Sequence, residues 1–223
     1  MTSLFERAMG DDFARLHPML QKRFGVGLEP GYGCIGRGMM SSIRRGPWWT
    51  VPFLRIGKFR NILIVDHGND IPFVIENYPY RDPLGRETVT FVREYTIRGH
   101  RRRFDATMVA GPDGAVVDYL GTHQHLAVDL DLSAQPDGSL LLRSDAQRFY
   151  EGPVGFRFPM LFSGRAELRE SFDDTTGTFR VDLSVTNERF GFLFGYRGEF
   201  ECEFVEATDA PERLKPKRHE SRF

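Results

Sequence analysis

The segment 164–204 constrains the fold most, because apolar residues recur there at every second position. Three successive runs share this alternation: Gly164, Ala166, Leu168 and Phe172; then Phe179, Val181, Leu183 and Val185; then Phe190, Phe192, Phe194, Tyr196, Phe200, Cys202 and Phe204. Side chains on a β-strand point alternately to opposite faces, so each run has one face towards a core and one towards water. The pattern predicts three consecutive strands of an antiparallel sheet that curves around a core.

Turn signals divide the chain from Ile71 onward into further short strands. Pro, Gly, Asp and Thr cluster at positions 82–85, 111–114, 136–138 and 174–177, which is typical of reverse turns. Before them, residues 32–44 read as a glycine-rich first strand. We therefore predict roughly ten strands.

The N-terminal segment has a helical period instead. Apolar residues recur three or four apart at Phe5, Met9, Phe13, Leu16, Leu20 and Phe24. The stripe breaks at Gly10 and restarts near Pro18, with Ser3 and Glu6 as a capping box. His17, just before the restart, is expected to be a capping or packing histidine, and a functional role is the alternative. The predicted fold is all-β with short N-terminal helices: a single antiparallel β-barrel or strongly curved half-barrel, calycin-like in outline.

Residues 1–205 are expected to form this single domain, because barrels of such length are commonly one domain. The polar segment 206–223, with two prolines and several basic residues, predicts a disordered tail. The formal net charge of −1 gives no global field for nucleic acid. No apolar run approaches the roughly 18 residues of a membrane span, and no signal peptide is visible. We expect a soluble, cytoplasmic protein.

A second apolar segment, residues 46–59, carries Trp48 and Trp49. It is apolar almost all round and predicts a helix that closes one end of the barrel. Two other interpretations stay open: a movable lid over a cavity, or a patch that touches lipid.

The glycines at 31, 33 and 36 match the dinucleotide-binding pattern literally. That chemistry requires a strand before the glycines and a helix after them, and neither context fits. We predict no cofactor.

Three charged residues fall in the apolar phase of their strands: Arg93, Arg102 and Glu170. A buried charge without a partner costs several kcal/mol, so these side chains should pair or meet a ligand. Two compatible interpretations follow: a structural Arg93–Glu170 ion pair, or a polar anchor for a ligand head group.

His123, His125 and Asp129 suggest a metal site, because alternate residues of a strand point the same way. The opposite phase, which contains Leu126, Val128 and Leu130, is the apolar one. The two histidines and Asp129 are therefore expected to face water, without a metal.

Several short motifs, in this order, resemble one family. They are the segment 13–18; Phe91, Arg93, Tyr95 and Phe104; Gly155, Phe158 and Pro159; Glu170, Asp173, Gly177, Phe179 and Val181; and Gly191, Tyr196, Arg197, Gly198 and Phe200. Over about residues 4–204 the chain resembles the bacterial family known as domain of unknown function 4166. In that family the domain also occurs fused behind reductase-like NAD(P)-binding domains. The resemblance implies a binding or accessory role beside an enzyme, and it supplies no catalytic residues.

The leading hypothesis is a non-catalytic binding module for a small hydrophobic or amphipathic molecule. Its ligand-binding residues are Arg93, Glu170 and Arg102 as polar groups, Tyr95, Phe192, Phe194 and Tyr196 as aromatic lining, and Trp48 and Trp49 as the lid. One alternative is a cofactor-independent isomerase or lyase that uses a buried Arg/Glu pair. Another is a filled barrel that acts as a protein-interaction domain.

Overall fold

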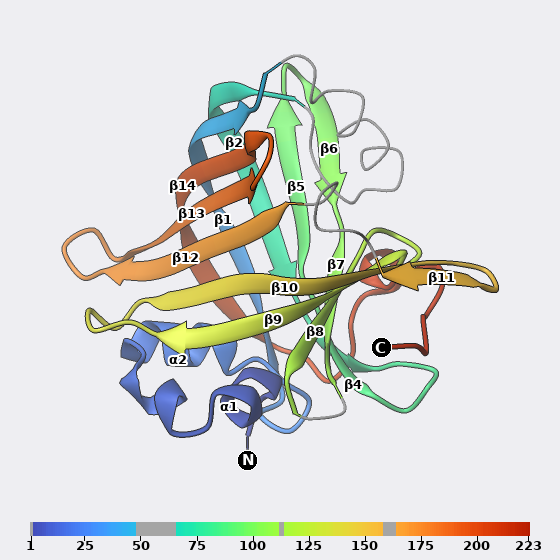
Figure 1. Cartoon of the computed structure of the whole chain (residues 1–223). Helices are drawn as coiled ribbons and strands as arrows, with labels where there is room; N and C mark the ends of the chain where they lie inside the picture. Colours follow the sequence, from blue (N-terminus) through green and yellow to red (C-terminus); the bar gives the residue numbers. More distant parts are fainter. Residues whose placement is uncertain (1, 48–65, 112–113, 158–163) are drawn as a thin grey trace.

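The computed structural model describes residues 2–47, 66–111, 114–157 and 164–223 of the chain (Figure 1). Trp48 and Trp49 lie outside the described residues. Antiparallel strands dominate the described part, and short helices at the N-terminus lie against one end of the sheet. The predicted all-β class is confirmed, and of the two predicted forms the sheet adopts the strongly curved half-barrel.

The N-terminal helices follow the predicted stripe. They are α1 (Leu4–Met9), the 3₁₀ helix η1 (Gly10–Arg15) and α2 (Pro18–Phe24). The Ser3 hydroxyl accepts a hydrogen bond from the Glu6 amide, and His17 Nδ1 accepts one from the Met19 amide, so Ser3 caps α1 and His17 caps α2. The apolar stripe is buried, and Figure 1 shows α1 and α2 at the lower end of the barrel.

The described residues form a sheet of fourteen strands. In chain order these are β1 (Tyr32–Arg45), β2 (Gly68–Asn77), β3 (Pro79–Arg81), β4 (Glu87–Thr90), β5 (Val92–Ile97), β6 (His100–Phe104), β7 (Ala106–Ala110), β8 (Val116–Leu120), β9 (Leu126–Ala134), β10 (Leu140–Glu151), β11 (Val154–Arg157), β12 (Arg165–Asp173), β13 (Thr178–Asn187) and β14 (Gly191–Glu206). The number exceeds the predicted ten because three long strands are each interrupted once, at Tyr78, Phe91 and Asp105, and β11 is a short branch of β10.

Antiparallel pairing runs most of the way around the molecule, in an open path that has β3 and β6 at its two ends. The strands pair in chain order from β7 through β10 and then from β12 through β14, and β14 pairs along nearly the whole of β1. β1 pairs with β2, β2 pairs with β5, and β5 pairs with β6. Along the chain, β4 continues into β5 after Phe91, and β6 continues into β7 after Asp105. β4 and β7 pair with each other. β6 pairs with β5 alone among the described strands, so the sheet is strongly curled and split at that end.

Close backbone approach explains the glycine-rich sequence of β1. A Cβ atom at Gly38 would lie 2.0 Å from the carbonyl oxygen of Glu199 on β14, and one at Gly36 would lie 2.5 Å from the Ile75 side chain. Only glycine fits there. The glycines at 33 and 36 therefore serve strand packing, as predicted, and open no helix.

The segment 206–223 is ordered, so the predicted disordered tail is wrong. Residues 207–223, here called the C-terminal strap, contain the 3₁₀ helix η4 (Glu212–Leu214) and cross the outer face of the barrel. Leu214 is 1% exposed, and Arg213 donates two hydrogen bonds, of 2.7 and 2.6 Å, to the Glu76 carboxylate. The polar composition suggested disorder, but these charges find fixed partners on the sheet.

The strap covers a second apolar cluster on the outer face, formed by Val109, Val117, Tyr119, Ala127 and Tyr150. The Tyr119 and Tyr150 hydroxyls donate to the carbonyl oxygens of Arg222 and Phe223. The main core fills the interior of the barrel. No described helix is long and apolar enough to cross a membrane.

Candidate functional site

Arg93 on β5 and Glu170 on β12 line one interior cavity, together with Arg23, Met40, Met108 and Tyr196. Phase alone predicted that both charges face inward. The cavity volume is about 20 Å³, which is room for about one water molecule. The side chains around it therefore pack closely.

Glu170 pairs with Arg23 rather than with Arg93, so the predicted Arg93–Glu170 ion pair is wrong. Arg23 enters the barrel from α2, and its Nε donates to Glu170 Oε1. The Arg23 side chain is 1% exposed and that of Glu170 is 4% exposed. Burial lowers the pKa of Arg23, but the Glu170 carboxylate and the thiols of Cys202 and Cys34 together raise it more, so the net shift is upward.

Further groups complete the environment of Arg23. Its Nη1 donates to Asn77 Oδ1 at 2.8 Å and to Cys34 Sγ at 3.4 Å, and the Phe200 ring lies 4.9 Å below the guanidinium. The Asn77 amide in turn donates to the Thr90 carbonyl oxygen at 3.0 Å. Arg23 and Glu170 thus form a satisfied ion pair that ties α2 to the sheet.

Two free thiols, Cys34 and Cys202, lie beside this pair on adjacent strands. A hydrogen bond from Cys202 lowers the pKa of Cys34 to about 7, burial opposes the shift, and the Arg23 charge adds to it. The same hydrogen bond and burial raise the pKa of Cys202. Cys34 is therefore the more acidic of the two thiols.

Arg93 is buried without an acidic partner. Its guanidinium donates one long hydrogen bond, of 3.5 Å, to the Phe91 carbonyl oxygen, and it forms no ion pair within the described part of the chain. The Phe104 and Phe91 rings lie 5.0 and 5.8 Å from it. A guanidinium has five N–H donors, so most of the hydrogen-bonding capacity of Arg93 is unused.

Asp118 on β8 faces the same interior. It lies in phase with Val116, a core residue, whereas Val117 and Tyr119 point to the outer cluster. Its Oδ1 is buried without a hydrogen-bond partner among the described residues. Burial raises the pKa of Asp118 to about 7, and the Arg93 charge opposes the shift.

Tyr95 and Tyr196 form the aromatic side of the site, with ring centroids 6.2 Å apart. Tyr95 stacks on Phe73 at 6.0 Å, and Tyr196 meets Phe194 edge-on at 6.0 Å. Burial raises the pKa of both tyrosines, and Arg93 opposes the shift in each case. Both phenols are therefore neutral near neutral pH.

Two other predicted site residues lie elsewhere. The pairing of β13 with β14 shifts register between the pairs Val185–Phe194 and Thr186–Phe192. The Phe192 ring lies 5.3 Å from the guanidinium of Arg44. Arg44 is exposed, so Phe192 belongs to the outer surface. Arg102 Nε donates to Asp66 Oδ2 at 2.8 Å, and the Arg102 side chain is partly exposed.

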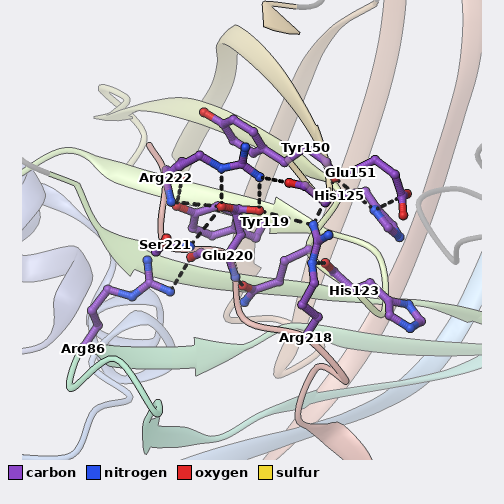
Figure 2. Close-up of polar contacts among 12 residues, drawn as sticks. Arg86, Tyr119, His123, His125, Tyr150, Glu151, Arg218, Glu220, Ser221 and Arg222 are labelled. Carbon is purple, nitrogen blue, oxygen red and sulfur yellow. Dashed lines mark hydrogen bonds and ion pairs between the residues drawn. The ribbon is translucent and has the colours of Figure 1, made fainter. Parts of the chain in front are cut away.

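The structure places His123 and His125 under the C-terminal strap (Figure 2). His125 is 1% exposed, so the expectation that it faces water is wrong. Its Nδ1 lies 3.2 Å from the Tyr150 carbonyl oxygen and 3.1 Å from Glu151 Oε2, and Arg218 donates to the carbonyl oxygens of His123 and Tyr150.

Asp129 is held by both terminal nitrogens of Arg148. Within the described ranges, no group of three or more His, Cys, Asp or Glu side chains is arranged to hold a metal ion.

The comparison with protein families agrees with the predicted resemblance. The family model described as domain of unknown function (DUF4166) matches residues 16–200. The chain belongs to this family. The uncharacterized protein YndH of Bacillus subtilis (strain 168) is similar to it, with 30% identity over 204 residues that cover 91% of this chain and 98% of YndH. The matched region of the DUF4166 domain contains Arg23, Arg93, Asp118 and Glu170.

Sequence reasoning missed Arg23 and Asp118, although both carry a signal. Arg23 lies three residues after Leu20 and seven after Leu16, on the apolar stripe of the helix. Asp118 is an acid in phase with Val116, but its strand is apolar on both faces, so the phase that points inward was ambiguous.

Proposed function

We propose that this DUF4166 domain is a non-catalytic binding module for a small hydrophobic or amphipathic molecule, held inside the barrel in a calycin-like manner. The observation that carries the proposal is Arg93, a buried guanidinium that faces the cavity with no acidic partner in the described part of the chain. Leaving such a charge unpaired costs several kcal/mol. A bound polar group offsets that cost.

The rest of the cavity wall suits the apolar part of a ligand. Phe24, Phe73, Phe91, Phe200 and the two methionines contribute to it. The cavity must expand to admit more than a water molecule. Met40 and Met108 provide the means, because methionine side chains are unbranched and change rotamer easily.

The Arg23–Glu170 ion pair argues against Glu170 as a general base, which weakens the isomerase or lyase alternative. The filled barrel that acts through its surface remains the second candidate, because a cavity of about 20 Å³ supports it. A reductase-type protein partner and a cytoplasmic location stay predictions from the sequence.

Native mass spectrometry of the purified chain, followed by denaturing extraction, tests the proposal. We expect a small molecule that co-purifies with the wild type and is lost from Arg93→Gln. The matched control is Arg180→Gln, because Arg180 is an exposed β13 residue that pairs with Asp173 and Glu199. Circular dichroism checks that both variants fold.

Two outcomes would overturn the proposal. The first is retention of the same molecule by Arg93→Gln at the wild-type level. The second is a bare protein mass in repeated wild-type preparations, which favours the filled barrel.

A further inference from the structure

We infer that the interior site binds the carboxylate head group of a ligand at Arg93, and that Asp118 must hold a proton for this anion to bind. The inference rests on the proposed function and names the class of ligand: a small amphipathic monocarboxylate. Three steps support it.

The first step is the charge balance of the interior. Four charged side chains of the described residues face it: Arg23, Glu170, Arg93 and Asp118. Arg23 and Glu170 neutralise each other through their ion pair. When Asp118 holds a proton, Arg93 leaves one uncompensated positive charge, and an anion completes the balance.

The second step is hydrogen-bond geometry. A guanidinium offers parallel N–H donors that match the two oxygens of a carboxylate, and such charge-assisted pairs are about twice as strong as neutral ones. The donors of Arg93 are nearly unused.

The third step is the role of Asp118. Ionised, it places a negative charge near Arg93, repels an incoming carboxylate and reduces the attraction of the guanidinium. Protonated, it becomes a donor itself. The pKa of about 7 that burial gives Asp118 puts this change near neutral pH.

Other titratable groups face the same interior as Asp118. They are Arg23 from α2, Cys34 from β1, Arg93 and Tyr95 from β5, Glu170 from β12, and Tyr196 and Cys202 from β14. Arg23 and Glu170 are paired with each other, and burial keeps both tyrosines neutral. Cys34 also has a pKa of about 7, so a Cys34→Ser variant separates its contribution.

The experiment is isothermal titration calorimetry of the chain with octanoate and, separately, with 1-octanol, each at about pH 6 and about pH 8. Octanoate is ionised at both pH values. We expect octanoate to bind about tenfold more weakly at the higher pH. This is the factor expected when binding requires one protonated group whose pKa lies between the two pH values. 1-Octanol should bind more weakly than octanoate at about pH 6 and show no pH dependence.

The variants assign the effect to residues. Asp118→Asn should bind octanoate with nearly equal affinity at the two pH values, whereas Cys34→Ser and Asp131→Asn should behave as the wild type. Asp131 is the matched control, because it is an exposed acid on the neighbouring strand β9. Arg93→Gln should lower octanoate affinity at least tenfold.

Each contrary result has a distinct meaning. Equal, pH-independent binding of octanol and octanoate overturns the inference and leaves the proposed function standing. Octanoate binding that keeps its pH dependence in Asp118→Asn overturns the role of Asp118. Octanoate binding that Arg93→Gln leaves unchanged overturns the carboxylate site. No binding of either amphiphile overturns both proposals.

Discussion

Replacing Asp118 by asparagine should stabilise the protein increasingly as pH rises. The folded chain holds the Asp118 proton with a pKa of about 7, against an ordinary value of 3.8. Below the ordinary value, both folded and unfolded chains bind the proton, so the shift costs nothing. Between the two values only the folded chain keeps it, and the free energy of unfolding falls by about 1.4 kcal/mol per pH unit.

The full effect is therefore about 4 kcal/mol, complete once the pH exceeds the folded pKa. About 3 kcal/mol of it falls between roughly pH 4.5 and pH 8. Asp118→Asn does not titrate, so its stability relative to the wild type should increase by that amount over the interval. Comparing the two pH values cancels any fixed effect of the substitution on packing.

Urea denaturation of wild type and variant at both pH values measures this difference. Asp131→Asn, an exposed acid, should show little change. The reasoning is refuted if Asp118→Asn differs from the wild type by the same free energy at both pH values. It is also refuted if the variant becomes relatively less stable as pH rises.

Three further perturbations test the fold. Glu170→Gln leaves the buried Arg23 without a counter-charge, so the free energy of unfolding measured in urea should fall by about 3–5 kcal/mol. A double variant with methionine at positions 23 and 170 should recover most of this loss. Additive losses from the two single substitutions would contradict the ion pair. Gly38→Ala places a Cβ atom 2.0 Å from the Glu199 carbonyl oxygen. This substitution should therefore destabilise the protein by about 1–3 kcal/mol and lower its Tm by several degrees. An unchanged Tm would argue against the register of β1 with β14. Glu220→Gln weakens the ion pairs that Glu220 forms within the strap with Arg218 and Arg222. These two arginines donate to the carbonyl oxygens of Tyr150 and Gly152, so hydrogen exchange should accelerate at the strap amides and not at β13. Uniform exchange rates would count against a locally held strap.

The fold was predictable from the sequence because alternation carries most of the information about a half-buried sheet. The runs around Leu168, Val181 and Phe200 point these residues inward as predicted. The same phase argument placed Arg93 and Glu170 inside. A residue's face follows from local period alone, so these predictions needed no knowledge of tertiary contacts.

Pairing between distant residues was not predictable in this way. Glu170 meets Arg23 because α2 docks against β12, across 147 positions of the chain, and no local pattern encodes that contact. Phe192 shows a second limit, since one register shift sends a side chain to the other face of the sheet.

The strap shows why composition misled. Its charged residues are individually typical of a disordered segment. They become ordered because Glu76 presents a complementary partner to Arg213. The backbone at Tyr150 and His123 presents further partners to Arg218 (Figure 2). Those partners come from β2, β10 and the loop before β9, and the sequence alone does not reveal that they converge on one surface.

A crystal structure of the full chain grown with octanoate tests the central claim most directly. The account predicts a carboxylate within hydrogen-bonding distance of the Arg93 guanidinium, with Met40 or Met108 in a new rotamer around the alkyl chain. It would be contradicted by an unchanged interior, with octanoate absent or bound only on the outer surface.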